Sequence, residues 1–284
     1  MTVDPRLLAS ATGADSQAAT ALSADHGAGV ERQALLACFD ALLQPERFKD
    51  YGPNGLQVEG RPQVRRIVSG VTASLALIEQ AVAWQADALF VHHGLFWRGQ
   101  DGRVTGWMKQ RLALLLQHEI NLFAYHLPLD AHPQLGNNAQ LGQRLGLMPL
   151  EGEAGRFGDN GLGFLGQRAD GASFGDAQEL ARRIEGVLGR PVTCIPGRPG
   201  PVRTLGWCTG GAQGYFEAAI AAGAQAFITG EISEPQAHLA RETGVSFIAC
   251  GHHASERYGA PAVAGHVAAQ LGLDHQFIEI PNPA

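Results

Sequence analysis

Apolar residues recur along this chain with two different spacings. Where they stand three and four positions apart they predict amphipathic helices, and where they form short runs ending at glycine or a polar cluster they predict buried strands. The predicted helices span residues 34–43, 75–85, 105–118, 134–145, 175–188, 215–222, 234–242 and 260–271. The predicted strands span residues 66–71, 88–91, 122–125, 162–167, 192–195, 204–208, 226–229, 246–250 and 275–280.

This alternation of strands and helices predicts the α/β fold class. Helices are expected to cover a parallel or mixed sheet, and ligands of such folds bind beyond the carboxyl ends of the strands. The clearest loops, residues 152–159 and 196–201, bracket a middle lobe. Residues 1–28 are rich in Ala, Ser, Thr and Gly and lack the pattern of a secretory signal, so we expect a flexible N-terminal extension, with a weak helix at 17–22 as the alternative.

The bulk composition excludes several classes of protein. The chain has 284 residues, 45% of them hydrophobic, which is enough for a normal core, and a net charge of −6 without any basic run, which argues against a nucleic-acid partner. No stretch reaches the roughly 18 apolar residues of a membrane helix. The four cysteines form no CxxC pair, so neither a thiolate zinc site nor a disulfide framework is indicated, and we expect a cytoplasmic protein.

Three histidine-containing clusters directly follow predicted strands. They are Val91-His92-His93-Gly94, Tyr125-His126-Leu127-Pro128-Leu129-Asp130-Ala131-His132 and Gly251-His252-His253-Ala254-Ser255-Glu256. With His118 just upstream of the second cluster, these stretches hold seven of the 11 histidines. Because imidazoles and carboxylates are ligands of divalent zinc, iron, manganese and nickel, the clusters predict one composite metal site.

The spacing within the clusters suggests how the side chains point. His252 and Glu256 stand four apart, so a helical turn would direct both the same way, and the carboxylate could then bridge two cations. Pro128 favours an extended loop between His126 and Asp130. Adjacent side chains diverge on a strand, so His92 and His93 would serve different ions, which indicates a dinuclear site.

Other motifs carry less chemistry. Residues 161–166 match GxGxxG, but the glycines alternate with large apolar residues as in a strand, so we expect no nucleotide site there. There is no phosphate-binding loop and no GxSxG nucleophile motif. Residues 51–57 are interpreted as a tight turn around Asn54-Gly55. Trp97 and Trp107 are expected to pack around the first histidine pair or to cover the site.

The motifs together resemble the GTP cyclohydrolase 1 type 2 homologs, the Nif-three-like family of dinuclear-metal hexameric proteins. The motifs in question are Asn54-Gly55-Leu56-Gln57-Val58, His92-His93-Gly94-Leu95-Phe96-Trp97, Tyr125-His126-Leu127-Pro128-Leu129-Asp130, Gly136-Asn137-Asn138, Thr229-Gly230-Glu231 and Gly251-His252-His253-Ala254-Ser255-Glu256-Arg257. The resemblance implies that His92, His93, Asp130, His252 and Glu256 hold two metal ions, with Glu256 bridging them.

The resemblance also implies two interlocked α/β lobes with mixed sheets and assembly as a homohexamer. The first lobe would comprise residues 29–145 and 246–284, and the second residues 146–245. The chain differs from the family pattern by the extra N-terminal segment and by lacking the large insertion that some members place between the halves.

The leading functional hypothesis is a metal-dependent hydrolase with two divalent ions per chain, acting on a small phosphorylated or heterocyclic substrate. His126 and His253 are the candidates for proton transfer, and Arg98 and Arg257 could hold a substrate anion. Five protein ligands for two ions leave coordination positions open, which favours catalysis over a closed structural site. The alternatives are a non-catalytic carrier, sensor or scaffold, and a GTP cyclohydrolase-like activity that follows from the family name only.

Overall fold

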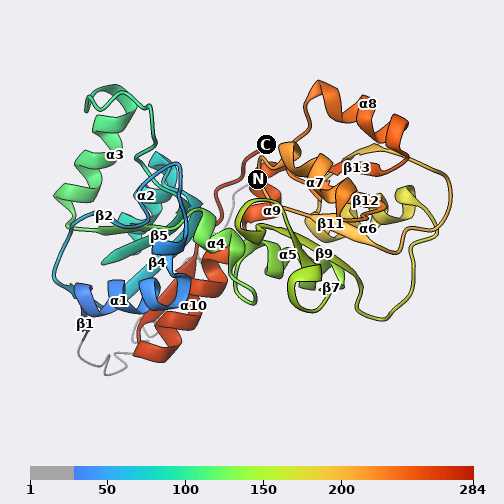
Figure 1. Ribbon diagram of the computed structural model, residues 1–284. Coiled ribbons are helices and arrows are strands. Elements are labelled where there is room, and N and C mark those ends of the chain that lie inside the picture. Colours follow the sequence, from blue (N-terminus) through green and yellow to red (C-terminus); the bar gives the residue numbers. More distant parts are fainter. Residues whose placement is uncertain (1–28) are drawn as a thin grey trace, which may run out of the picture.

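The computed structural model describes residues 29–284, which form two α/β lobes side by side (Figure 1). The predicted extension at residues 1–28 lies outside the described residues. The first lobe contains a five-stranded sheet in the order β14-β4-β5-β6-β2. Its strands are β2 (Gly55–Val58), β4 (Arg66–Thr72), β5 (Ala88–His93), β6 (Asn121–Ala124) and β14 (Asp274–Phe277). All neighbours are parallel except β2, which pairs antiparallel with β6.

Helices cover both faces of this first sheet because its central strands are apolar on both sides. On β5, Leu89 and Val91 pack into one core, while Ala88 and Phe90 pack into the other. The helices are α2 (Leu75–Ala83) and α3 (Gly106–Gln117) on the first face, and α1 (Arg32–Leu43) and α10 (Gly259–Leu271) on the second. A small antiparallel pair, β1 (Val30–Glu31) with β3 (Gln63–Val64), lies beside them. No helix within residues 29–284 is long and apolar enough to cross a membrane.

The second lobe contains a mixed sheet of seven strands. They are β7 (Leu147–Pro149), β8 (Arg156–Phe157), β9 (Gly163–Arg168), β10 (Thr193–Ile195), β11 (Leu205–Trp207), β12 (Ala226–Thr229) and β13 (Ser246–Ala249). The main order is β10-β13-β12-β11-β9-β7, with β8 on β9. Helices α5 (Asn137–Leu145) and α6 (Ala177–Leu188) pack on one face, and α7 (Phe216–Ala221) and α8 (Glu234–Thr243) on the other. The short 3-10 turns are Pro45–Arg47, Gly152–Gly155, Asp159–Gly161 and Gln213–Tyr215.

The expected boundary between the lobes differs from the observed one. Residues 137–145 and 246–249 are expected in the first lobe, but residues 137–145 form α5, which packs on the second sheet, and residues 246–249 form β13, which pairs with β12 and β10 in that sheet. Phe247 and Ile248 are fully buried in that lobe, on opposite faces of the sheet. The chain therefore returns to the first lobe only after residue 249, through α9 (His252–Glu256) and α10.

Two local predictions are also corrected. Residues 51–57 form a turn only in their first half, since Gly55–Val58 is strand β2. The segment after His126 is not extended but forms the short helix α4 (Leu127–Ala131). Pro128 lies in the first turn of this helix, where its missing N–H group has no helical partner to lose.

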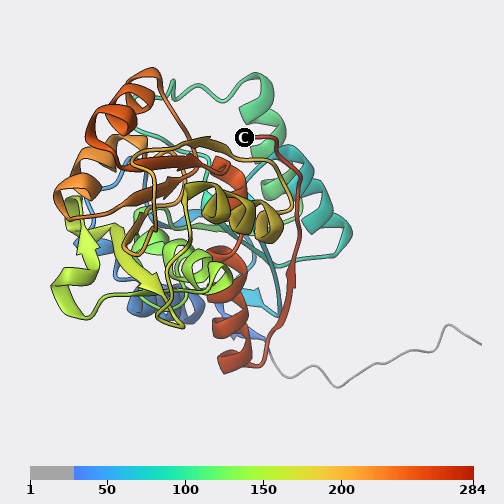
Figure 2. The same cartoon turned by 90° about the vertical axis from the view of Figure 1, so that its right-hand side faces the viewer.

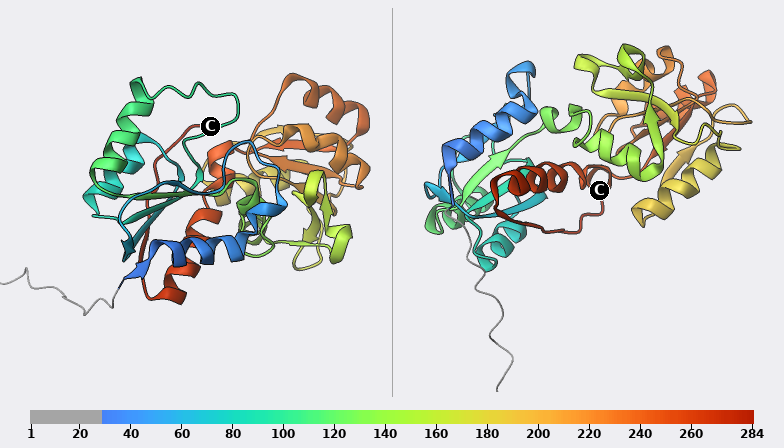
Figure 3. Two further views of the ribbon diagram at one scale, coloured as in Figure 1. Left: turned by 60° about the vertical axis from the view of Figure 1, so that its left-hand side comes forward. Right: turned by 90° about the horizontal axis from the view of Figure 1, so that it is seen from below.

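The C-terminal segment after β14 runs along the outside of the molecule (Figure 2) and ends where the two lobes join (Figures 1 and 3). Arg190, which follows α6, donates hydrogen bonds to the carbonyl oxygens of Pro283 (2.9 Å) and Ala284 (3.0 Å). The backbone N–H of His253 also donates to the oxygen of Ala284. The two lobes are thus interlocked, because the chain passes from one to the other three times.

Candidate metal centre

The end of strand β5 and the helices α4 and α9 meet where the two lobes join (Figure 1). His92 and His93 are the last residues of β5, Asp130 lies in α4, and α9 begins with His252 and ends with Glu256. The structure therefore brings together all five side chains that the resemblance implied as metal ligands.

Glu256 lies at the centre of this cluster. Its Oε1 atom is 3.3 Å from Nε2 of His92, and its Oε2 atom is 3.3 Å from Nε2 of His93 and 3.1 Å from Nε2 of His252. Nε2 of His92 is also 3.5 Å from Oδ1 of Asp130. Three overlapping groups have ligand atoms within 4.8 Å of one another: His92, His93 and His126; His93, His252 and Glu256; His92, Asp130 and Glu256.

Two buried polar atoms at the centre fit a bound cation. Among the described residues, Nε2 of His92 and Oε2 of Glu256 are buried and make no hydrogen bond. A buried polar atom without a partner costs about 1–3 kcal/mol. A cation between these side chains would satisfy both atoms, so the residues present suit a metal ion.

The electrostatics of the cluster also suit a bound cation. Burial lowers the pKa of His92, but the carboxylates of Asp130 and Glu256 outweigh burial and raise it to about 9. Burial lowers the pKa of His93 to about 3. For Glu256 burial raises the pKa, yet the charges of His92 and His93 hold it well below its ordinary value. The buried carboxylates therefore favour positive charge beside them, which a metal ion can supply.

Local structure explains why these ligands can approach each other. The four-residue spacing in α9 places His252 and Glu256 on one face, as predicted. Gly210 has a φ of +70°, and a Cβ atom there would overlap the carboxylate of Glu256. The rings of His92 and His93 lie only 4.5 Å apart, so they do not diverge as expected. They nevertheless approach different oxygens of Glu256.

A second layer of hydrogen bonds orients the histidines through their Nδ1 atoms. The partners are the carbonyl oxygen of Tyr125 for His92 (3.1 Å), Oγ1 of Thr72 for His93 (3.1 Å) and Oε1 of Glu231 for His252 (2.6 Å). Such bonds fix the tautomer, so that each Nε2 atom is directed toward the centre.

Asp130 is held by two side chains of the second lobe, one from helix α5 and one from the segment after β11. Its Oδ1 atom accepts hydrogen bonds from Nδ2 of Asn137 (2.9 Å) and Oγ1 of Thr209 (3.2 Å). Asn137 is itself fully buried and accepts from the backbone N–H of Gly259. The orientation of this carboxylate therefore depends on the contact between the two lobes.

His126 forms a hydrogen-bonded pair with Asp50 beside the cluster. Its Nδ1 atom donates to Oδ1 of Asp50 at 2.7 Å, and Oδ2 of Asp50 accepts from the N–H of Leu127 and from Asn54. Burial raises the pKa of Asp50, but the hydrogen bond and charge of His126 together with the hydrogen bonds from Asn54 and Leu127 outweigh burial and lower the pKa to about 2. The ring of Trp97 stands edge-on to His126 at 5.1 Å, so this tryptophan packs beside the histidines, which is one of the two positions expected for it.

Other predicted residues lie away from the centre. Nε2 of His253 pairs with Oε1 of Glu279 in the C-terminal segment (2.5 Å), so its expected role in proton transfer gains no support from its position. Arg257 donates to the carbonyl oxygen of Leu188. The side chain of Trp107 is 54% exposed on α3 and does not line the site.

Sequence reasoning missed the residues that orient the ligands. Glu231 and Asn137 belong to motifs that carried the family resemblance, and both stand near the ends of elements that lead to the site. Asp50 directly precedes the turn at residues 51–54, and this position is the only feature of the sequence that indicates a role for it. Thr209 comes shortly after strand β11, just as the histidines come after the apolar run of β5. This position after a buried strand could have indicated that Thr209 lies near the site.

A cavity of about 200 Å³ opens beside the cluster. Its walls are formed by Tyr51, His126, Leu127, Asp130, Leu162, Cys208, Thr209, Gly211, Ala212, Tyr215, His252 and Glu256. A small molecule in this cavity would touch ligands of the cluster and the His126 ring.

Three histidines and two carboxylates lie close together where the two α/β lobes join. These features define a class of protein with a preformed cluster of side chains that could hold a metal ion. The profile of the family Duf34/NIF3 (NGG1p interacting factor 3) matches residues 30–283, and the chain belongs to this family. The resemblance predicted from the motifs and the mixed α/β fold class are thereby confirmed.

Relatives and solved structures agree with this assignment. A Pseudomonas aeruginosa protein named GTP cyclohydrolase 1 type 2 homolog is 50% identical over 246 residues, which are 86% of this chain and 95% of that protein. A Neisseria meningitidis protein of the same name is 49% identical over 90% of this chain and all of its own length. The solved structure of protein ybgI, of unknown function, is 44% identical with a TM-score of 0.84, covering 90% of this chain and 100% of that one. A structure from Thermus thermophilus is 34% identical with a TM-score of 0.80 and the same coverage.

Proposed function

We propose that this chain holds two divalent metal ions and hydrolyses a small phosphorylated or heterocyclic molecule. The observation that carries the proposal is the pair of buried atoms, Nε2 of His92 and Oε2 of Glu256, that face the centre without hydrogen-bond partners. His92, His93, Asp130, His252 and Glu256 would hold the ions.

The position of Glu256 supports two ions rather than one. One of its oxygens faces His92, and the other faces His93 and His252. A carboxylate with different histidines at its two oxygens is suited to bridge two cations and to offset their repulsion. When bound, two such ions would supply Lewis acidity, which lowers the pKa of a nearby water toward about 7 and stabilises negative charge on oxygen.

The His126–Asp50 pair would supply the proton transfer. Because Asp50 accepts the Nδ1 proton of His126, the Nε2 atom of His126 is left to take a proton from the attacking water. The carboxylate of Asp50 would stabilise the imidazolium that results. Trp97, packed against both His126 and His93, would exclude water from this side of the site.

The size of the adjacent cavity bears on the substrate. At about 200 Å³ it lies below the range of roughly 300–1,000 Å³ that is typical of sites for drug-sized ligands. This favours a substrate smaller than a nucleoside triphosphate, or one of which only the reacting group enters. The rings of Tyr51 and Tyr215 in its walls suit a planar heterocycle. The GTP cyclohydrolase-like alternative follows from the names of relatives and has no such support.

The main alternative is a non-catalytic carrier, sensor or scaffold that binds the same ions. The hydrogen-bonded His126–Asp50 pair beside the ligands favours hydrolysis, since a carrier has no need of an oriented base. Zinc, iron, manganese and nickel all accept these ligands, so the identity of the ions stays open.

We further propose that the protein assembles as a homohexamer. Three large apolar side chains on or next to α3, Val104, Trp107 and Leu116, are each more than half exposed. Exposed apolar side chains gathered on one element are typical of a surface that another protein covers. Light scattering of the purified chain tests the assembly: a monomer would contradict it.

The decisive experiment for the reaction is metal analysis followed by a substrate screen. The protein is purified without added metal, its metal content is measured, and a panel of phosphoesters, nucleotides, amides and cyclic amidines is tested with that metal restored. We expect turnover that a chelator abolishes and that rises with pH toward neutrality. Absence of metal-dependent turnover across the panel would favour the carrier.

A further inference from the structure

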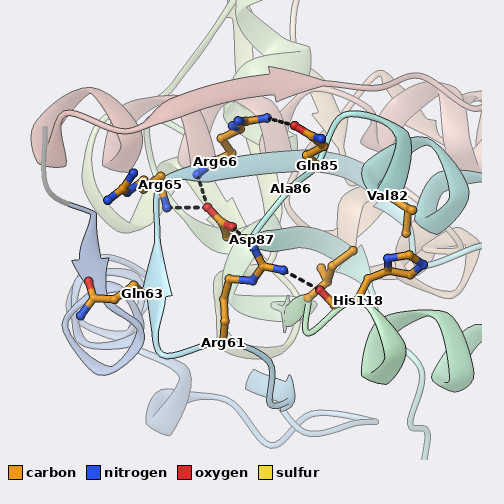
Figure 4. Close-up of a pocket in the computed structure, with 10 residues that line it drawn as sticks. Arg61, Gln63, Arg65, Arg66, Val82, Gln85, Ala86, Asp87 and His118 are labelled. Atoms are coloured by element: carbon orange, nitrogen blue, oxygen red, sulfur yellow. Dashed lines mark hydrogen bonds and ion pairs between the residues drawn. The ribbon is translucent and has the colours of Figure 1, made fainter. Parts of the chain in front are cut away.

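A second and larger cavity, of about 530 Å³, lies in the first lobe at the opposite end of the sheet from the metal centre. Its walls are formed by Arg61, Gln63, Arg65, Arg66, Val82, Gln85, Ala86, Asp87, His118 and Ile120 (Figure 4). These residues lie where β4, β5 and β6 begin, whereas His92 and His93 stand where β5 ends. The six residues of β5 lie between the two sites, and at a rise of about 3.3 Å per residue they separate the sites by roughly 20 Å.

The walls of this cavity carry excess positive charge. Three arginines line it, and Asp87 is its only carboxylate. Both oxygens of Asp87 already accept hydrogen bonds: Oδ1 from Nη1 of Arg61 (2.8 Å), and Oδ2 from the backbone N–H groups of Arg65 (2.8 Å) and Arg66 (3.0 Å). Asp87 thus neutralises one arginine and leaves two positive charges, although the chain as a whole has a net charge of −6.

One of the three arginines that line the cavity has a guanidinium group without an acceptor among residues 29–284. No residue between 29 and 284 accepts a hydrogen bond from the guanidinium of Arg65, which extends away from Asp87 in Figure 4. Arg61 is engaged, because its Nη1 atom donates to Asp87 and its Nη2 atom donates to the carbonyl oxygen of His118 (2.9 Å). Arg66 is also held, at the rim, by bonds to the carbonyl oxygen of Trp84 and to Gln85. An anion in the cavity would provide the acceptors that the guanidinium of Arg65 lacks.

The shape and chemistry of the cavity indicate a class of ligand. The guanidinium group matches the geometry of a phosphate, to which it can donate two parallel hydrogen bonds. The volume lies within the roughly 300–1,000 Å³ of small-molecule sites. Val82, Ala86 and Ile120 add an apolar wall on which a base or another uncharged group could rest.

We propose that this cavity binds a phosphorylated small molecule of nucleotide size, with Arg65 as the ligand of the phosphate groups. The site is separate from the metal centre and does not depend on the proposed reaction. The fold presents it on the same sheet that carries His92 and His93.

Calorimetric titration of the full-length, metal-containing protein with ADP tests the proposal, with adenosine as the phosphate-free comparison. We expect ADP to bind and adenosine not to bind. Arg65→Gln should weaken ADP binding about tenfold or more, because it removes a charge-assisted contact. Arg203→Gln is the matched control, since Arg203 is an exposed arginine of the second lobe, and it should leave the affinity unchanged.

The metal-site variant Glu256→Gln distinguishes the two cavities. If ADP occupies the basic cavity, this variant should bind ADP as the wild type does. Because the Arg65 side chain has no partner among residues 29–284, Arg65→Gln should fold normally, and Arg65→Lys should retain part of the affinity. The proposal is overturned if ADP does not bind at millimolar concentration, if Arg65→Gln binds it unchanged, or if Glu256→Gln abolishes binding.

Discussion

Replacement of Glu256 by glutamine should reduce the metal content of the protein more than any other single change at the centre. Glu256 is 2% exposed and belongs to two of the three groups of ligand atoms. Glutamine has nearly the same shape but no charge, so the formal charge of the five ligands changes from −2 to −1 while the two ions still carry +4. The amide N–H₂ group would also face a cation or an imidazole nitrogen.

The size of the effect follows from the burial of the carboxylate. Removal of one partner from a buried ionic contact costs about 3–5 kcal/mol, which corresponds to roughly a hundredfold to several-thousandfold weaker binding. We therefore expect metal analysis to find about two ions per chain in the wild type and one or fewer in Glu256→Gln. His92→Ala and His93→Ala should each weaken mainly one ion.

Two controls make this result interpretable. Glu242→Gln changes an exposed carboxylate of the second lobe and should retain both ions. Circular dichroism should show that Glu256→Gln is folded, because the strands around the site are apolar in their own right. Two tightly held ions in folded Glu256→Gln would refute the bridging role, and an unfolded variant would mean that the ions are structural.

Three further predictions concern the residues around the ligands. His126→Ala should retain both ions but lower turnover about 10²–10⁴-fold, as loss of a general base does; loss of an ion in metal analysis would instead identify His126 as a ligand. Asp50→Asn should destabilise the metal-free protein by about 1–2 kcal/mol at neutral pH. This value is smaller than the pKa shift alone implies, because solvent screens part of the interaction. Since the pKa of Asp50 falls from 3.8 to about 2 on folding, this stabilisation is full above about pH 5 and is lost toward pH 2, so wild-type and Asp50→Asn urea unfolding curves should converge on acidification; a pH-independent difference would contradict the assignment of the stabilisation to the Asp50 carboxylate. Asn137→Ala should weaken metal binding roughly 10–100-fold by freeing Asp130, and unchanged affinity in a competition titration would show that Asn137 has no part in orienting it.

The order of elements and most of the site could be predicted because their signals are local. The apolar run of β5 followed by two histidines marks both a buried strand and a ligand position at its end. In α9, a four-residue spacing was sufficient to place His252 beside Glu256. Such features depend on backbone periodicity alone, which the sequence carries directly.

The remaining features depend on contacts between distant segments. Gly55–Val58 looks like part of a turn and becomes a strand only because β6 offers it a pairing edge. Asp50 and His126 are 76 positions apart, and nothing local joins them. His253 directly follows His252, but successive residues of a helix point about 100° apart, so His253 meets Glu279 of the C-terminal segment instead.

Anomalous X-ray diffraction from crystals of the metal-containing protein tests the central claim most directly. Data collected above and below the absorption edge of the metal found by elemental analysis should show two peaks per chain, about 3.5–4 Å apart, on either side of the Glu256 carboxylate. One peak should contact His92 and Asp130, and the other His93 and His252. A single peak, or no peak between these side chains in protein with a measured metal content, would contradict the dinuclear centre.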